Sequence, residues 1–120
     1  MEIKQIDHVQ LAMPVGGSDE AKKYYSDVLG IPEVPRPTSM KSIGHWFHAG
    51  DLKVHLGEEE DFRPALKAHP AFEVDDLEAL KSRLDAAGYS YKAGSVIEGI
   101  VRIFASDPFG NRIEFLQLID

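Results

Sequence analysis

The stretch 107-DPFGNRIEFLQL-118 decides both the fold and the candidate chemistry of this chain. It opens with a turn, because Pro108 fixes its own φ and Gly110 tolerates a positive φ. Residues 112–118 then alternate as a strand, which places apolar side chains on one face and Glu114 on the other. Burying an unpaired carboxylate in such a strand would cost several kcal/mol. Two interpretations of Glu114 therefore stay open: a solvated or salt-bridged side chain, or a metal ligand or catalytic base.

Composition limits the classes of function. The 120 residues predict one domain, and 43% hydrophobic with 28% charged residues is typical of a globular protein. The chain has no cysteine, which excludes disulfides, thiolate metal sites and cysteine nucleophiles. A net charge of −7 disfavours nucleic acid as a partner, although a bound metal would still permit a small anionic substrate. No apolar leader or membrane-length run is present, so we expect a cytoplasmic protein without membrane contact.

Alternation and turn residues predict two similar sets of elements. The first set is a strand over 3–13, a helix from an N-cap at Ser18 to Gly30, a short edge strand near 31–34, and a hairpin of 43–49 and 52–56. Residues 57–67 are expected to form a surface connection. The second set is a strand over 69–74, a helix from an N-cap at Asp75 to Gly88, and strands at 89–93, 99–105 and 112–118.

The two sets also repeat in their letters. Residues 20–30 and 78–88 share the pattern EAxKxxxDxxG, identical at five of eleven positions with an offset of 58 residues. Two copies of one β-α-β-β-β unit predict an α+β fold with pseudo-twofold symmetry. We therefore expect a single domain over 1–120, with module 1 at about 1–60 and module 2 at about 66–120.

Four polar residues lie on the strand faces opposite the aliphatic residues. They are His8, His55, His69 and Glu114. The repeat pairs His8 with His69, and His55 with Glu114. If the aliphatic faces pack on the helices, the polar faces line a shared groove. Imidazole and carboxylate groups in that groove would suit a divalent transition metal such as Zn, Fe, Mn, Ni or Co.

Other polar residues receive a simpler interpretation. His45 and His48 are predicted to be surface histidines or satisfied core histidines. Arg102 and Arg112 are predicted to form surface ion pairs in preference to binding a substrate anion. No glycine-rich phosphate loop and no G-x-S-x-G nucleophile elbow is present.

Four motifs spread over the whole chain resemble one family. They are IDHVQLAMP, YYSDVLGI, HPAFEVDD with LDAAG, and DPFGNRIEF. The chain resembles the vicinal oxygen chelate superfamily, also called the glyoxalase/bleomycin resistance/dioxygenase family. The resemblance implies two βαβββ modules whose mixed sheet curves around a cleft that holds a divalent metal, with the helices on the outer face. It also implies a ligand triad of His8, His69 and Glu114, with His55 at the fourth position.

The resemblance implies chemistry in which the metal chelates two neighbouring oxygens of the substrate. We expect a glyoxalase-like isomerase or lyase, with Glu114 as ligand and base and His55 as fourth ligand or acid/base. The alternatives are an extradiol-dioxygenase-like oxygenase and a metal-free drug-binding protein of the bleomycin resistance type. Glyoxalase I carries a glutamate where His55 stands, and most extradiol dioxygenases are longer.

We also expect a homodimer. In this family the modules pair within one chain or across two. In the second case His8 and His55 would come from one subunit, and His69 and Glu114 from the other.

Overall fold

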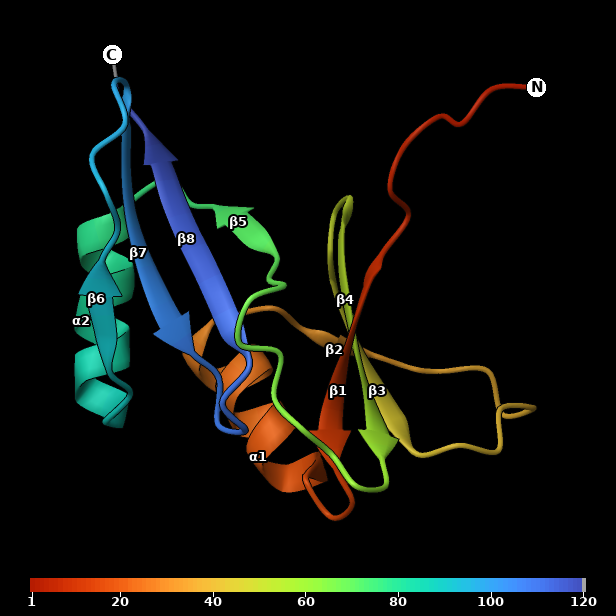
Figure 1. The fold of residues 1–120 in the computed structure, drawn as a ribbon. Helices are drawn as coiled ribbons and strands as arrows, with labels where there is room; N and C mark the ends of the chain where they lie inside the picture. The colour runs from red at the N-terminus through yellow and green to blue at the C-terminus, as the bar shows by residue number, and fades with distance from the viewer. Residues whose placement is uncertain (120) are drawn as a thin grey trace. The chain divides into compact units, whose positions relative to one another are not determined.

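The computed structural model describes residues 1–119, and the chain divides into two compact units, Met1–Phe62 and a second from Arg63 onward. Each unit contains a strand, a helical segment and three further strands (Figure 1), as expected for βαβββ modules of an α+β protein. The first unit consists of β1 Val9–Pro14, α1 Ser18–Lys22, the π-helical η1 Lys23–Val28, β2 Glu33–Val34, β3 Gly44–Ala49 and β4 Leu52–Glu59. The second consists of β5 Ala71–Glu73, α2 Leu77–Ala87, β6 Tyr91–Ala93, β7 Ile100–Ser106 and β8 Arg112–Leu118.

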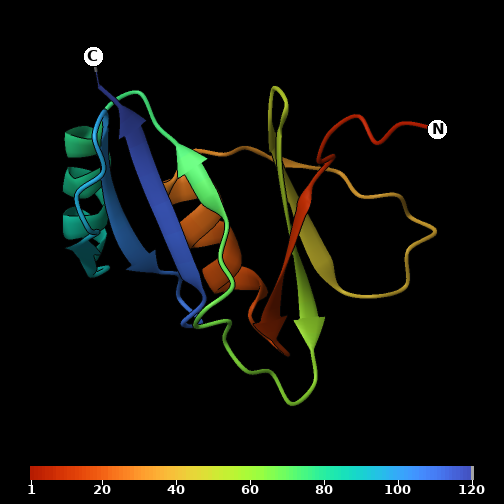
Figure 2. The ribbon, with the colours of Figure 1, turned by 45° about the horizontal axis from the view of Figure 1, so that its top comes forward.

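Both sheets have the same strand order, with the first strand of the unit beside the last. The orders are β1-β4-β3-β2 and β5-β8-β7-β6 (Figure 2). The first and last strands run parallel, with Val9 opposite Val54 and Ala71 opposite Glu114, and the other pairs are antiparallel. This pairing brings the residues that precede the first strand close to the last strand of the same unit.

Each unit has its own apolar core beneath one face of its sheet. In the first unit, Tyr24 and Tyr25 of η1 are fully buried, and the ring of Tyr25 stacks on Phe47 of β3 at 5.7 Å between centroids. In the second unit, the helix α2 runs beside the sheet in both ribbon views. Its buried stripe is Leu77, Leu80 and Leu84, the spacing expected of an amphipathic helix. None of the helices described within residues 1–119 is long and apolar enough to cross a membrane.

The first strand of each unit is shorter than predicted. β1 begins at Val9 rather than at residue 3, so His8 lies just before the strand. The pairing register explains this, because Val9 lies opposite Val54 and β4 itself begins at Leu52. Residues before Asp7 therefore have no length of β4 left to pair with. His69 likewise precedes its strand.

The strand β4 is longer than predicted. It continues to Glu59 instead of ending at Leu56, because Met13 and Pro14 of β1 pair with Glu58 and Glu59. The first part of the supposed surface connection is thus a strand.

Neither predicted helix N-cap residue caps its helix in the structure. Ser18 is the first helical residue, and its hydroxyl contacts Nε2 of His45 at 2.8 Å instead of capping the helix. The cap of α2 is Asp76 and not Asp75: Asp76 is extended, and its carboxylate accepts a hydrogen bond from the backbone N–H of Ala79 at 3.0 Å. Capping requires this extended backbone, which composition alone does not assign.

Candidate functional site

The second unit joins His69 to Glu114. Glu114 projects from β8 and is only 7% exposed. Its backbone N–H donates to the carbonyl of Pro70 at 3.0 Å, which brings the segment before β5 against it. Nε2 of His69 lies 3.1 Å from Oε1 of Glu114. The buried carboxylate is therefore paired, and its partner is one of the predicted site residues.

The other carboxylate oxygen of Glu114 faces an arginine. Nη1 of Arg102, on β7, donates to Oε2 of Glu114 at 3.4 Å. The same guanidinium donates to the hydroxyl and carbonyl of Ser95 at 2.7 and 3.3 Å. The predicted ion pair of Arg102 is confirmed, but its side chain is only 17% exposed and its partner is a candidate ligand.

Arg112 is a correction to the sequence prediction. Within residues 1–119 it forms no ion pair with an acidic side chain; its guanidinium carbon lies 4.1 Å from the ring centroid of Phe104. The ring of Phe104 in turn meets the imidazole of His69 edge to face at 5.4 Å. A cation and an aromatic ring thus adjoin the His69–Glu114 pair.

The first unit joins His8 to His55. Their rings stack with centroids 4.3 Å apart and planes inclined by 20°. His55, on β4, is buried, whereas His8 is exposed and its Nδ1 lies 2.9 Å from a carboxylate oxygen of Asp7. The indole of Trp46 also stacks on His55, at 4.4 Å and 7°. Stacking fixes the plane of the His55 ring.

His48 belongs to this cluster, and sequence analysis missed it. Its Nε2 lies 2.9 Å from Nε2 of His55, so one of the two nitrogens carries the shared proton. The register of the predicted hairpin could have indicated it. Trp46 pairs with His55, and His48 pairs with Lys53, so all four side chains lie on one face. The simpler interpretation holds for His45, whose nitrogens contact Glu33 and Ser18.

Burial controls the charge of His55. Desolvation, followed by repulsion from His8 and His48, lowers the pKa of His55 from 6.5 to about 4. Its imidazole is therefore neutral near pH 7, which is the form that ligates metals. Hydrogen bonding from His8, with the charge of Lys53, lowers the pKa of Asp7.

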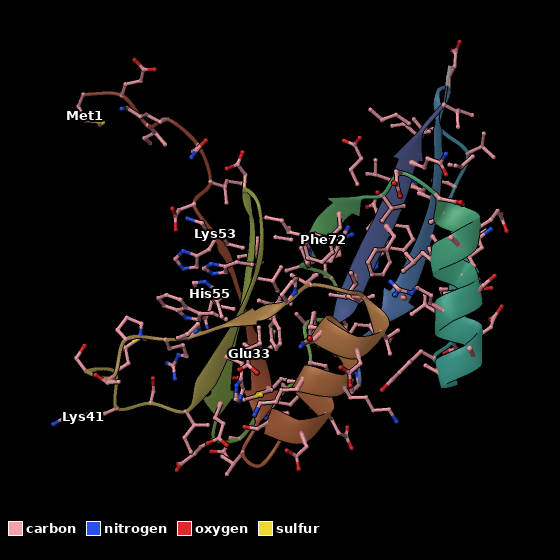
Figure 3. The ribbon with its side chains drawn as sticks, turned by 180° about the vertical axis from the view of Figure 1, so that it is seen from behind. Met1, Glu33, Lys41, Lys53, His55 and Phe72 are labelled. Atoms are coloured by element: carbon pink, nitrogen blue, oxygen red, sulfur yellow. The ribbon has the colours of Figure 1, made fainter. Side chains whose placement is uncertain are left out.

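These side chains line a hollow of about 300 Å³ in the first unit. Figure 3 labels Lys53 and His55, which project to the same side of β4. The lining residues are Asp7, His8, Gln10, Met40, Trp46, His48, Lys53 and His55.

The donor groups fit a divalent metal in kind and, in one unit, in spacing. Neighbouring ligands at an octahedral ion with bonds of about 2.1 Å lie about 3.0 Å apart, close to the 3.1 Å between His69 and Glu114. The stacked rings of His8 and His55 do not aim their nitrogens at a common point. No group of three or more His, Asp or Glu side chains within residues 1–119 is positioned to hold one ion. The second unit therefore holds two donors at ligand spacing, whereas His8 and His55 of the first unit lie side by side but would have to unstack to bind one ion.

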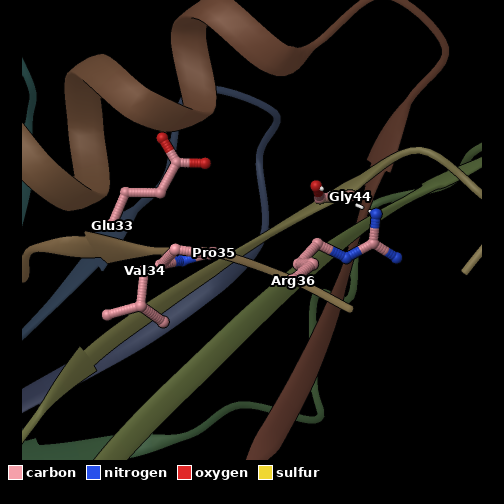
Figure 4. Close-up of a pocket in the computed structure, with 5 residues that line it drawn as sticks. All are labelled: Glu33, Val34, Pro35, Arg36 and Gly44. Carbon is pink, nitrogen blue, oxygen red and sulfur yellow. Dashed lines mark hydrogen bonds between the residues drawn. The ribbon is translucent and has the colours of Figure 1, made fainter. Parts of the chain in front are cut away.

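A second hollow of the first unit, of about 460 Å³, lies beside Arg36 and Gly44 (Figure 4). The Arg36 guanidinium donates to the carbonyls of Ser42 and Gly44 at 2.9 and 3.2 Å. A β-carbon on Gly44 would lie 2.5 Å from the carbonyl oxygen of Leu56 and 3.3 Å from the Arg36 guanidinium carbon. The close approach of the Leu56 backbone requires glycine at position 44. Because the Arg36 guanidinium donates to backbone carbonyls of its own loop, we assign Arg36 a structural role.

Comparisons with known proteins agree with one another. Residues 5–115 match the family model described as Glyoxalase/Bleomycin resistance protein/Dioxygenase superfamily. A curated relative, Glyoxylase I 4 of Arabidopsis thaliana, is 28% identical over 107 residues; the match covers 80% of this chain but spans only 62% of the relative.

Two solved structures are also similar. A glyoxalase family protein from Bacillus anthracis is 40% identical, with a TM-score of 0.93 over 98% of both chains. A mutant of the fosfomycin resistance protein FosX from Listeria monocytogenes, in complex with Mn(II) and 1S,2S-dihydroxypropylphosphonic acid, is 16% identical. The TM-score is 0.79 over 95% of this chain and 92% of that chain, which shows that the two proteins have a similar fold.

Proposed function

The chain belongs to the glyoxalase/bleomycin resistance protein/dioxygenase superfamily, and on that premise we propose that it is a divalent-metal-dependent enzyme acting on a small, vicinally oxygenated substrate. The resemblance inferred from the sequence is thereby confirmed, and the reaction is the proposal. Glyoxalase-like isomerase or lyase chemistry fits best. The contact of buried Glu114 with His69 carries this proposal, because a buried carboxylate beside an imidazole is a donor pair suited to a divalent cation.

The proposed ligands are one pair from each unit. His8 and His55 form the pair of the first unit, and His69 and Glu114 form the pair of the second. Relatives support a metal: the FosX complex contains Mn(II). A bound divalent metal would supply a Lewis acid for two neighbouring substrate oxygens.

The residues of this chain have separate tasks in the proposal. Arg102 and His69 hold the two carboxylate oxygens of Glu114, so that this side chain is oriented before substrate arrives. Trp46 fixes the plane of His55, and burial keeps that imidazole neutral near pH 7, the form that can ligate a metal. Glu114 is the proposed base, and His55 the proposed fourth ligand or acid/base.

Metal content is the direct test. The protein would be purified without chelator or affinity tag and analysed for transition metals, alongside the variants His69→Ala and Glu114→Ala. We expect a stoichiometric metal in the wild type and at least a tenfold lower affinity in both variants. Glu73→Ala serves as the matched control, because Glu73 is an exposed carboxylate on β5. No metal in the wild type, or equal metal in all four proteins, would refute the proposal.

Substrate class would follow from a screen of the metal-loaded protein against dicarbonyl, catechol, epoxide and acyl-CoA compounds. Turnover of a catechol with O₂ would assign the oxygenase alternative instead. Saturable ligand binding that is indifferent to chelator would assign the drug-binding alternative.

Assembly and location complete the proposal. We expect a homodimer in the cytoplasm. Light scattering coupled to size exclusion measures the mass of the assembly directly, and a monomer of 13.3 kDa would contradict the dimer.

A further inference from the structure

Arg112 is a half-buried cation of the second unit that has no acidic partner within residues 1–119, whereas the other unpaired cations of that unit, Arg63, Lys67, Arg83 and Lys92, are exposed. The ion pairs of that unit use other residues: Arg102 pairs with Glu114, and Lys81 pairs with Glu78. Arg112 instead lies over Phe104, with its guanidinium carbon 4.1 Å from the ring centroid. Such stacking uses the face of the guanidinium and leaves its N–H groups in the plane free to bind oxygen.

The position of Arg112 follows from the register of β7 and β8. Phe104 lies opposite Glu114 and Ser106 lies opposite Arg112, so Arg112 and Glu114 are two residues apart on one strand and share a face. Phe104 contacts both Arg112 and His69. The free cation thus stands on the face that carries the proposed ligand pair.

The charges on this face do not balance. The strand registers place three positive residues on it, Arg102, Arg112 and Lys92, against two negative ones, Glu73 and Glu114. Arg102 neutralises Glu114, and an excess of one positive charge is left. The face is therefore positive even in a chain with a net charge of −7. A bound divalent cation would increase the excess. A face of this kind attracts an anion to the site.

We infer that Arg112 binds the anionic group of the substrate, a carboxylate or a phosphate-type oxyanion, on the face that carries His69 and Glu114. Both groups present two oxygens to the planar N–H fork of arginine. The substrate would then combine this anion with the neighbouring oxygens that the metal binds. The inference extends the proposed function to a substrate class and depends on it for the identity of the site, but the anion contact itself requires no metal.

Binding of small probes to the metal-free protein tests the inference. Lactate and 1,2-propanediol share a three-carbon skeleton with vicinal oxygens, and only lactate carries a carboxylate; inorganic phosphate represents the other oxyanion. Each would be titrated into ¹⁵N-labelled protein after EDTA treatment, with ¹H–¹⁵N spectra recording the dissociation constant. The variants are Arg112→Gln, Arg112→Lys and, as matched control, Arg83→Gln, because Arg83 is an exposed arginine of α2.

We expect lactate or phosphate to bind the wild type and to perturb the β8 resonances, and propanediol to bind at least tenfold more weakly. Arg112→Gln should weaken anion binding about tenfold, and Arg112→Lys should weaken it less, since lysine keeps the charge but loses the fork. Arg83→Gln should bind as the wild type does. The anion that loses more affinity in Arg112→Gln identifies the natural group as carboxylate or phosphate.

Equal anion affinity in Arg112→Gln and the wild type, or no anion binding by the wild type, would overturn the inference. The same proteins titrated with Mn(II) separate this result from the proposed function. We expect Arg112→Gln to bind Mn(II) within about twofold of the wild type. A wild type that binds the anion at Arg112 but no metal would refute the metal-dependent function and leave the anion site standing.

Discussion

Replacing His55 by glutamine should make the first unit less sensitive to acid. In the metal-free wild type the pKa of His55 is lowered to about 4, whereas in the unfolded chain it is 6.5. Between these values the unfolded chain takes up a proton that the folded unit refuses, so stability falls as the pH falls. At about pH 7.5 and above the imidazole is almost entirely neutral in both states, and this contribution vanishes.

The magnitude follows from the two pKa values. At about pH 4.5 the unfolded imidazole is almost fully protonated, and the folded one is about a quarter protonated. The proton linkage then costs the folded state about 2.5 kcal/mol relative to about pH 7.5. Glutamine cannot titrate but can still hydrogen-bond to His48, so His55→Gln should lose about 2.5 kcal/mol less stability than the wild type over this pH interval.

Urea denaturation followed by tryptophan fluorescence measures this difference. Trp46 is the single tryptophan of the chain and stacks on His55, so its fluorescence reports on the first unit. Free energies would be taken from the transition midpoints, because protonation also changes the intensity. His45→Gln is the matched control, because His45 lies on the other face of the hairpin from His55. The stability that this variant loses over the pH interval should match the loss of the wild type within about 0.5 kcal/mol. Equal acid sensitivity in His55→Gln and the wild type would refute the assignment of a buried neutral imidazole.

Three further substitutions test the fold. Gly44→Ala should destabilise the first unit by about 2 kcal/mol or more in the same fluorescence assay, because its β-carbon would lie 2.5 Å from the carbonyl oxygen of Leu56; an unchanged midpoint would contradict this close approach. Asp76→Ala should cost about 1 kcal/mol by circular dichroism, whereas Asp75→Ala should cost less than about 0.5, and the reverse order would restore Asp75 as the cap. Asp107→Ala should cost about 2–4 kcal/mol, since this buried carboxylate accepts hydrogen bonds from Phe109 and Asn111 in the turn before β8; a loss below about 1 kcal/mol would show that the turn holds without it.

The sequence predicted the parts of the fold that local patterns control. The strand 112–118 was correct at both ends, because a turn precedes it and its alternation is regular. Both helices stop before a glycine in the left-handed region, Gly30 at φ 77° and Gly88 at φ 81°, as expected of C-terminal glycines. The length of β1 was wrong because it depends on where β4 begins, and alternation within residues 3–8 carries no information about a distant partner.

The candidate site was predictable in its pairs but incomplete in its surroundings. The repeat singled out His69 and Glu114, because their equivalents in the first module, His8 and His55, also lie in contact with each other. His48 was missed because its importance comes from the cross-strand face it shares with His55, a tertiary property. Arg112 was misjudged because an arginine on a strand usually finds an acid, and only the register shows that its neighbour is Phe104.

The parallel pairing of first and last strands has a consequence for the order of folding. The hairpin of β3 and β4 closes a short loop and can form within about 1–10 μs. The pairing of Val9 with Val54 closes a much longer loop, so it is slower. His69 and Glu114 are 45 residues apart and meet only when the corresponding long loop of the second unit closes. A nascent or partly assembled second module therefore exposes His69 and Glu114 singly, and their contact forms late in its assembly.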